Sequence, residues 1–257
     1  MQTPLVHPDD RDPARYGRSF ADVYDEWYAA TFDTEAALAS LRQLADGGSV
    51  LELGAGTGRL AIPLAGAGLD VVALDSSSEM LDHLRARDPA RRVGTLLADM
   101  AELDRSTDLG DRRFDVVVCA CSSILNLPDV DSIGRCIAGA ARRLTPDGVL
   151  VIEAIVPADA ASVPRRSLTP ARVCSDAAVF VETEFDPSTA RLHGRHVEVG
   201  NGSVTTRPWA VVLCDPARFD SFASDAGLVL AERWSDWTCT PFDDESSTHV
   251  SVWRRSP

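Results

Sequence analysis

The sequence predicts an α/β protein with a Rossmann-like, doubly wound, mostly parallel sheet and a small antiparallel β insertion after the fifth strand. Apolar strand-like runs alternate with helix-like runs through residues 47–156, which is typical of a parallel sheet covered by helices. Several of these strands are apolar throughout, as expected when both sheet faces are covered. Beyond residue 156, longer strands separated by turn residues indicate antiparallel pairing.

The first half of the chain predicts helices and strands in the following order. Residues 14–46 predict two helices, and Asp46-Gly47-Gly48 ends the second with glycine as its C-terminal cap. The expected strands are Val50–Leu53, Val71–Leu74, Val93–Leu97, Phe114–Cys119 and Val149–Ile155. The expected helices between them are Gly58–Ala67, Ser77–Arg87 and Ser132–Leu144. A capping box from Ser76 to Glu79 is expected to begin the second of these helices.

The second half begins with a proline-containing stretch, residues 157–171, which we expect to be a loop. Three strands of the insertion are then expected at Ala177–Glu184, Ala190–Val199 and Ser203–Leu213. A helix over Pro216–Ala226 and strands near Leu228–Trp234 and Thr248–Arg254 should follow. We expect the last two strands to return to the main sheet.

Composition limits the classes of function. The chain has 257 residues and a net charge of −14, and all of its basic residues are arginine. This acidic balance argues against a nucleic-acid or anionic-membrane surface, since both need clustered cations. The polar N-terminus and the lack of an apolar run of about 18 residues predict no signal peptide and no membrane span, so we expect a cytoplasmic location. The six cysteines form no C-x-x-C pair, which favours free thiols over a zinc site.

The most informative segment is LELGAGTGR, Leu51–Arg59, which joins a predicted strand to a predicted helix. Open α/β sheets bind ligands at this edge, and glycines let the backbone turn sharply and approach a ligand closely. A dinucleotide-binding loop would need a third small residue where this chain has Arg59, so we expect no pyrophosphate here. The alternative is a tight turn that binds nothing.

Acidic residues end the next two predicted strands. Asp75 lies 21 residues after Gly54 (75 − 54 = 21), the spacing at which a carboxylate accepts hydrogen bonds from ribose hydroxyls. Its alternative role is to cap the helix that begins near Ser77. Asp99 and Met100 end the third strand, where a side-chain acceptor and a backbone N–H are suited to reading an adenine edge.

These motifs resemble the class I S-adenosylmethionine-dependent methyltransferases. The matching segments are Val50–Leu64, Val72–Leu81, Ala98–Met100, Phe114–Leu127 and Leu144–Glu153. The resemblance implies that S-adenosylmethionine is the cofactor and that Glu52 orients the glycine loop and the methionine amine. It also implies that backbone near Ala120 and Cys121 meets the methionine portion. The cofactor-binding residues that it implies are Tyr16, Tyr24, Glu52, Gly54, Ala55, Gly56, Asp75, Ser76, Met80, Asp99, Met100, Cys119 and Ser122.

Within that superfamily, three features are similar to bacterial tailoring enzymes: the tyrosines near the N-terminus, the Cys121-Ser122-Ser123-Ile124 segment and the β insertion. The aminosugar N-methyltransferases are the nearest group of such enzymes. The similarity implies that residues 1–46 form a helical lid, whose tyrosines have ordinary helix packing as the alternative role. Residues 47–156 with 214–257 would bind the cofactor, and residues 157–213 would shape the acceptor site. The family often has histidine where this chain has Asn126, so a general base is absent at that position.

Few polar residues are candidates for the chemistry. Methyl transfer from a sulfonium is an in-line displacement whose activated methyl group belongs to the cofactor. The candidate catalytic residues are Glu153, His193 and His196, and the candidate substrate-pocket residues are Asn126 and Trp209. Glu153 has a structural hydrogen bond as its alternative role, and Trp209 has packing within the insertion. The two histidines lie three residues apart in a predicted strand, on opposite faces, so they do not form a paired metal site.

We therefore expect a metal-independent enzyme that transfers a methyl group from S-adenosylmethionine to an oxygen or nitrogen of a small natural product or sugar. Metal-dependent catechol-type methyltransferases need carboxylates where this chain has Cys119–Ser122. The expected partners are a small-molecule acceptor and, through the insertion, a second copy of the chain, with no nucleic acid and no membrane. The alternatives are a non-catalytic binding module, suggested by Asn126, and a nicotinamide-dependent oxidoreductase, which Arg59 disfavours.

Overall fold

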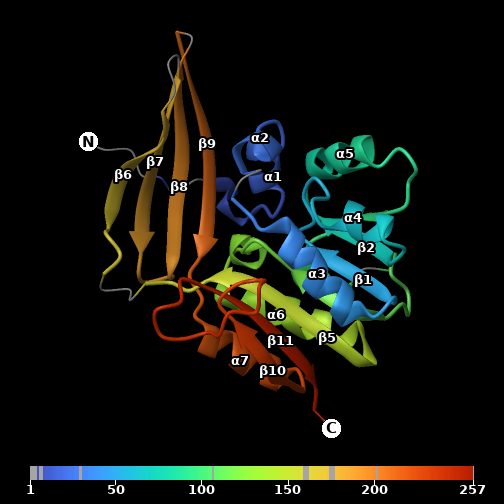
Figure 1. Ribbon diagram of the computed structural model, residues 1–257. Coiled ribbons are helices and arrows are strands. Elements are labelled where there is room, and N and C mark those ends of the chain that lie inside the picture. The colour runs from blue at the N-terminus through green and yellow to red at the C-terminus, as the bar shows by residue number, and fades with distance from the viewer. Residues whose placement is uncertain are drawn as a thin grey trace.

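The computed structural model describes residues 5, 8–28, 31–105, 107–158, 162–173, 177–200 and 202–256. It contains a seven-stranded sheet and a four-stranded sheet. The four-stranded sheet lies beside the main one, and short N-terminal helices lie between it and the helices that flank the main sheet (Figure 1).

The main sheet is confirmed as mostly parallel, with the order β10-β11-β5-β4-β1-β2-β3. Its parallel strands are β1 (Ser49–Leu53), β2 (Asp70–Asp75), β3 (Gly94–Leu97), β4 (Phe114–Cys119) and β5 (Leu144–Ile155). The two strands from the C-terminal part are β10 (Leu228–Trp234) and β11 (Thr248–Arg255). They return to this sheet, as predicted, and they pair in the antiparallel direction. The chain order reverses between β1 and β4, and a crevice for ligands is expected at such a switch point.

Helices cover both faces of the main sheet, which explains why several of its strands are apolar throughout. One face packs against α3 (Thr34–Ala45), α4 (Ala61–Gly66) and α5 (Ser78–Arg87). The other face packs against α6 (Val130–Arg142) and α7 (Pro216–Asp225). The result is a three-layer α/β structure (Figure 1).

The predicted capping box is wrong by one residue. The N-terminal cap of α5 is Ser77, whose Oγ accepts the backbone N–H of Met80 at 3.3 Å and donates to Glu79. Ser76 instead donates its hydroxyl to the backbone carbonyl of Pro13 at 2.8 Å. Ser76 therefore ties the start of this helix to the N-terminal segment.

The insertion is an antiparallel sheet with the order β6-β7-β8-β9. Its strands are β6 (Arg166–Val173), β7 (Ala177–Asp186), β8 (Arg191–Gly200) and β9 (Ser203–Val212). The predicted loop over 157–171 is wrong in its second part, because β6 occupies it. This strand is at the sheet edge and mostly exposed, so it carries no apolar pattern, and its register shifts after Pro170. Proline is tolerated at edges and bulges, where no ladder hydrogen bond is needed.

The N-terminal region contains more helical segments than the two predicted. They are η1 (Pro8–Arg11), α1 (Arg15–Phe20), α2 (Tyr24–Tyr28) and α3. The chain turns through residues 21–23 between α1 and α2, so what looks like one periodic stretch is divided. A division this short leaves no clear signal in hydrophobic periodicity.

The remaining sequence features concern cysteines, metals and membranes. The cysteines in the described residues are free, and Cys174 lies outside them. Within the same residues, no group of histidine, cysteine and acidic side chains is arranged to hold a metal ion. None of the helices described combines the length and the apolar character that crossing a bilayer requires.

Candidate active site

The glycine loop between β1 and α4 lies at the carboxyl edge of the main sheet. Gly54, Gly56 and Gly58 all have positive φ angles, of 69°, 55° and 83°. At Gly54 a Cβ atom would lie only 2.8 Å from the Cβ of Ser123, in the segment that follows β4. Glycine is therefore required there both by the backbone conformation and by the close approach of the two segments.

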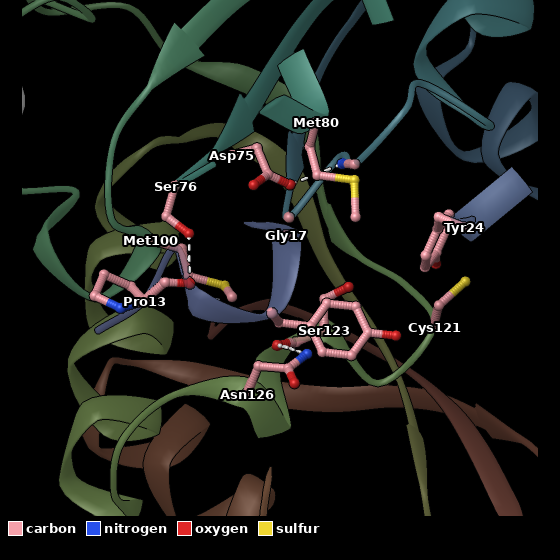
Figure 2. A pocket seen from close by; sticks show the side chains of 13 residues that line it. Pro13, Gly17, Tyr24, Asp75, Ser76, Met80, Met100, Cys121, Ser123 and Asn126 are labelled. Atoms are coloured by element: carbon pink, nitrogen blue, oxygen red, sulfur yellow. Dashed lines mark hydrogen bonds between the residues drawn. The ribbon is translucent and has the colours of Figure 1, made fainter. Parts of the chain in front are cut away.

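Three adjoining cavities, together called the edge cleft below, lie along this loop. The first is lined by Pro13, Tyr16, Gly17, Tyr24, Gly54, Gly56, Asp75, Ser76, Met80, Met100, Cys121, Ser123 and Asn126 (Figure 2). The second shares five of these and adds Leu74, Ala98, Asp99 and Leu127. The third also shares five of them and adds Glu52, Ala55, Thr57, Arg59 and Ala120. The structure thus brings together most of the predicted cofactor residues.

Asp75 connects the glycine loop to the start of α5. Its Oδ2 accepts the backbone N–H of Gly56 at 2.8 Å, and its Oδ1 accepts that of Ser77 at 2.8 Å. Burial raises the pKa of Asp75, and these backbone hydrogen bonds oppose the shift. The side chain thus has the local structural role considered for it and also lines the edge cleft (Figure 2).

Glu52 is a buried carboxyl group at the end of the cleft next to the glycine loop. It is 4% exposed, and its burial raises its pKa to about 8 although Arg59 and the backbone of Ala61 act against the shift. Its Oε2 has no hydrogen-bond partner among the described residues. A buried polar atom without a partner costs about 1–3 kcal/mol, so this position favours a ligand that brings a donor.

The other end of the cleft is more apolar. Leu74, Ala98, Met100 and Leu127 line it, which suits a flat aromatic ring. Asp99 lines it too, but its Oδ1 accepts the backbone N–H of Ala101 at 2.8 Å. With this hydrogen bond Asp99 caps the N-terminus of η2 (Met100–Glu102). Its second carboxylate oxygen makes no hydrogen bond that the structure shows.

Asn126 lies where the first two cavities meet, in η3 (Ser123–Asn126). Its Nδ2 donates to the backbone carbonyl of Ser123 at 3.3 Å (Figure 2). Its Oδ1 is buried and, in the described part of the chain, has no partner. The amide therefore offers an acceptor to a ligand, but no group that takes up a proton.

The N-terminal helices close the cleft from one side. Tyr16 and Tyr24 line it, and Tyr16 stacks on Phe20 with ring centroids 4.7 Å apart. Gly17 lets α1 come close to α5, because a Cβ at this position would lie 2.2 Å from the Cβ of Ser77. Glycine in a helix is unfavourable, so this close approach is the reason for its presence.

The segment after β4 presents side chains other than the two predicted. Cys119 is buried in the core, and the Oγ of Ser122 accepts the backbone N–H of Ile155 at 3.0 Å, so neither lines the edge cleft. Cys121 and Ser123 line it instead. The reason is a turn in which Cys121 and Ser122 have φ angles of 54° and 58°.

Glu153 stabilises that turn. Its Oε2 accepts the backbone N–H of Cys121 at 2.7 Å, and its backbone carbonyl accepts that of Ser122 at 3.0 Å. These contacts match the structural alternative considered for Glu153. The carboxylate of Glu153 therefore influences the cleft indirectly, by fixing the backbone of the turn that carries Cys121.

The two candidate histidines do not line the edge cleft. His193 is 5% exposed, with Nδ1 2.8 Å from Oδ2 of Asp10. His196 accepts the indole N–H of Trp209 at 3.1 Å and packs against the ring of Phe20, with centroids 5.2 Å apart. Burial lowers the pKa of both histidines. They therefore join the four-stranded sheet to the N-terminal helices.

Trp209 also lies outside the lining of the edge cleft. Its indole covers Gly194 on the neighbouring strand, where a Cβ would lie 2.2 Å from Cζ2 of the ring. It packs against the aromatic cluster of the N-terminal helices. This placement corresponds to the packing alternative considered for Trp209.

Sequence reasoning missed Pro13, Gly17 and Ser123 as lining residues and treated Arg59 only as evidence against a dinucleotide. Gly17 within a helix was a usable signal, since glycine there needs a reason. Pro13 offered none, because its placement depends on how distant segments pack. Ser123 belongs to a segment that the resemblance pointed to, but the resemblance did not indicate which of its side chains faces the cleft.

Comparison with known proteins identifies the family. Residues 50–148 match a family model described as a methyltransferase domain. The CcbJ methyltransferase from Streptomyces caelestis is 33% identical, and the match covers 96% of this chain and 100% of that chain with a TM-score of 0.87. The chain belongs to the S-adenosylmethionine-dependent methyltransferases.

Curated relatives of this methyltransferase include enzymes of natural-product biosynthesis. The cypemycin N-terminal methyltransferase of a Streptomyces species is 31% identical over 151 residues, 58% of this chain and 59% of the relative. The dTDP-3-amino-3,4,6-trideoxy-alpha-D-glucopyranose N,N-dimethyltransferase of Streptomyces venezuelae is 32% identical over 144 residues, 54% of this chain and 58% of the relative. The chain thus spans a little over half the length of the curated relatives that it matches.

The residues of this methyltransferase's edge cleft fit S-adenosylmethionine. The cofactor has an ammonium group, a ribose and an adenine, and it has no pyrophosphate. The unpartnered Oε2 of Glu52 provides an acceptor for an ammonium group, and the glycine loop leaves room for backbone contact. The apolar end of the cleft suits the base.

Proposed function

We propose that this enzyme methylates a nitrogen atom of a small natural product or sugar, in the cytoplasm and without a metal ion. The observation that carries the proposal is the unpartnered carboxylate oxygen of Glu52 at one end of a cleft that also contains Asp75. The printed names of two relatives, an N-terminal methyltransferase and an aminosugar N,N-dimethyltransferase, support nitrogen as the acceptor atom.

The edge cleft would hold the cofactor along its length. Glu52 would accept the ammonium group, the backbone at Gly54–Gly56 would contact the methionine portion, and Asp75 would accept the ribose hydroxyls. Asp99 and Met100 would border the adenine. When bound, the cofactor supplies an activated methyl group.

The enzyme's own contribution would be alignment and exclusion of water. Tyr16 and Tyr24 belong to short helices that cover the cleft and pack against the four-stranded sheet. Holding two reactants in line contributes roughly 7–11 kcal/mol to a displacement reaction. We infer that residues 1–46 form a lid and that residues 157–213 shape the acceptor site beside the cofactor-binding part.

None of the residues considered for the chemistry supplies a free base at the cleft, which favours an amine acceptor. His193 and His196 are held in contacts away from it, and position 126 carries an amide. Glu153 is engaged by the backbone of Cys121, so we assign it a positioning role in place of a catalytic one. A neutral amine attacks a methyl group without a strong base, whereas a hydroxyl usually needs one.

The test measures cofactor binding and acceptor choice separately. Calorimetry should show that the protein binds S-adenosylhomocysteine and does not bind NAD. Acceptor choice is measured by mass spectrometry on matched pairs of compounds: an amino sugar with its hydroxyl counterpart, and a short peptide with a free or an acetylated N-terminus. Only the member of each pair that carries a free amine should be methylated. A chelator should not change the amount of methylated product. Methylation of the hydroxyl member of a pair contradicts the acceptor assignment, and NAD binding in place of S-adenosylhomocysteine contradicts the cofactor assignment.

A further inference from the structure

Asp25 of the short helix α2 accepts hydrogen bonds from parts of the chain that are distant in sequence. Its Oδ1 accepts the hydroxyl of Thr57 at 2.6 Å, and its Oδ2 accepts an N–H of Arg87 at 2.9 Å. Thr57 belongs to the glycine loop that lines the edge cleft, and Arg87 is the last residue of α5. A single carboxylate of the N-terminal helices thus contacts both the cofactor loop and the helix that follows β2.

Thr57 is the point at which these contacts meet. It is 1% exposed and lies between Gly56 and Gly58, which both have positive φ angles. Nη1 of Arg87 also donates to the hydroxyl of Thr57 at 3.2 Å and to its backbone carbonyl at 3.3 Å. Glycine restricts the backbone little, so the conformation of this loop depends on partners supplied by α2 and α5.

The neighbouring residue of the loop is held by the main sheet. The backbone N–H of Gly56 donates to Oδ2 of Asp75, the last residue of β2, at 2.8 Å. Two adjacent loop residues, Gly56 and Thr57, are therefore fixed by two different carboxylates. Asp75 belongs to the rigid sheet, whereas Asp25 belongs to the helices that cover the cleft.

Helix α2 contacts the edge cleft and the glycine loop with consecutive residues. Tyr24 lines the edge cleft, and Asp25 follows it in the chain. A movement of α2 that withdraws Tyr24 from the cleft therefore also separates Asp25 from Thr57. The position of the helix and the hydrogen bonds of the loop change together.

We propose that Asp25 is a positioning residue that couples closure of the lid to the conformation of the glycine loop. The proposal rests on the proposed function, because it concerns the lid over the cofactor of that reaction. A cofactor that fixes the loop presents Thr57 to Asp25 and so holds α2 in the closed position. By thermodynamic linkage, lid closure and cofactor binding strengthen each other by the same factor.

The first measurement is the rate at which radiolabelled S-adenosylhomocysteine dissociates during a chase with unlabelled compound. We expect Asp25→Ala to accelerate dissociation about threefold to thirtyfold, as expected for loss of charge-assisted hydrogen bonds that are partly open to solvent. Asp25→Asn should give an intermediate rate, since it keeps an acceptor for Thr57 without the charge. This variant provides the same test if the alanine variant does not fold.

A second measurement separates coupling from a general structural role. Hydrogen–deuterium exchange is followed by mass spectrometry over residues 23–28 and 54–58, with and without S-adenosylhomocysteine. In the wild type, the compound should slow exchange in both segments. In Asp25→Ala, it should still slow exchange in the glycine loop, which contacts it directly, and should lose most of its effect in α2.

Glu26→Ala is the matched control, because Glu26 is the next residue of α2 and carries the same charge in the first turn of the helix. Its side chain is 77% exposed and lies 3.9 Å from Arg172 of β6, away from the glycine loop. The control should change the dissociation rate by less than about twofold, since an exposed ion pair contributes little. It should also keep the wild-type response of α2 to the compound.

Wild-type dissociation by Asp25→Ala, or equal acceleration by Asp25→Ala and Glu26→Ala, overturns the proposal. Undiminished protection of α2 by S-adenosylhomocysteine in Asp25→Ala overturns it as well. If the wild type does not bind S-adenosylhomocysteine at all, the proposed function fails first, which is a different result.

Discussion

Asp75 has two roles at the residue scale, because both oxygens of its carboxylate accept backbone N–H groups while the side chain lines the edge cleft. We expect Asp75→Ala to lower the free energy of unfolding by about 1–2 kcal/mol through the lost hydrogen bonds. It should also weaken S-adenosylhomocysteine binding at least about tenfold, through the lost ribose contact. Thermal unfolding and calorimetry measure the two effects.

The variant Asp33→Ala is the control that separates a loss of stability from a loss of cofactor contact. Asp33 caps α3, where its Oδ1 accepts the backbone N–H of Ala36 at 3.0 Å. Its replacement should cost about 1 kcal/mol of stability and leave S-adenosylhomocysteine binding unchanged. If Asp33→Ala and Asp75→Ala reduce binding equally, general destabilisation explains the loss and the ribose assignment is wrong.

Glu52 predicts a pH dependence of cofactor binding. Burial raises its pKa to about 8, so the free protein carries it largely protonated at neutral pH, whereas an ammonium ligand favours the carboxylate. Affinity for S-adenosylhomocysteine should therefore rise about tenfold for each pH unit below about 8 and level off above it. Calorimetry from pH 6 to pH 9 measures this. Glu52→Gln should bind more weakly with a flat profile, and a flat wild-type profile contradicts the assignment.

At the level of single residues, the sequence predicted those whose role follows from local pattern. Asp75 and Glu52 stand at fixed places relative to strands and to the glycine loop, so their positions at the sheet edge could be deduced. Cys119 and Ser122 do not line the edge cleft, because Cys119 is buried in the core at the end of β4 and the left-handed turn at Cys121 and Ser122 brings the Oγ of Ser122 to the backbone of Ile155. Such a turn is unusual for residues other than glycine, and nothing in the local sequence indicates it.

At the scale of elements, the placement of α1 depends on Gly17. A Cβ there would lie 2.2 Å from the Cβ of Ser77, which belongs to the cap of α5 and has little room to move. We expect Gly17→Ala to cost about 1–3 kcal/mol of stability through this clash. It should also weaken S-adenosylhomocysteine binding, because Tyr16 would move with the helix. Thermal unfolding and calorimetry measure both.

Gly66→Ala is the control for helix propensity. Gly66 is also helical, in α4, but a Cβ there would meet only Nη1 of Arg92, at the ordinary distance of 3.5 Å. Alanine should leave stability unchanged or raise it by up to about 1 kcal/mol. If Gly17→Ala and Gly66→Ala have the same stability and the same affinity for S-adenosylhomocysteine, the close packing of α1 on α5 does not contribute to cofactor binding.

Among the elements, the buried strands were the easiest to predict and the exposed edge was the hardest. Strands β1, β2 and β4 are buried nearly throughout because helices cover both faces, and their apolar runs mark them in the sequence. Strand β6 was missed because it is exposed and contains Pro170, so neither alternation nor composition marks it. The division of the N-terminal region into α1 and α2 was missed because helices of six and five residues are too short for a periodic signal.

At the scale of the whole molecule, His249 links stability to pH. It is 0% exposed beneath Phe219 and Phe242, its Nδ1 lies 2.8 Å from Oγ of Ser251, and burial lowers its pKa to about 4. Arg233 adds to the shift and Asp220 opposes it. Between pH 6.5 and pH 4 this histidine is therefore protonated in the unfolded chain and neutral in the folded protein. The free energy of unfolding decreases as the pH is lowered through this window, by about 3 kcal/mol in total.

His249→Asn should remove most of that loss, because the amide keeps a partner for Ser251 and does not titrate. Denaturant unfolding at several pH values from 4 to 7 measures it. His83→Asn replaces an exposed histidine in α5 and should leave the wild-type slope unchanged. An identical slope for wild type and His249→Asn would show that carboxylates alone account for the acid sensitivity.

The arrangement of the two sheets could not be predicted from the sequence. Its determinants join residues far apart in the chain, such as His193 with Asp10 and Arg207 with Asp22. Periodicity describes how an element meets its own sheet and carries no information on such distant pairs. This is why the candidate histidines were expected near the chemistry, whereas they join the insertion to the N-terminal helices.

The most direct test of the account is a crystal structure with S-adenosylhomocysteine. We predict that the ribose hydroxyls lie within hydrogen-bond distance of the Asp75 carboxylate, and that the amino-acid end lies beside Glu52. A complex in which the compound binds elsewhere, or in which Asp75 contacts no part of it, would contradict the account.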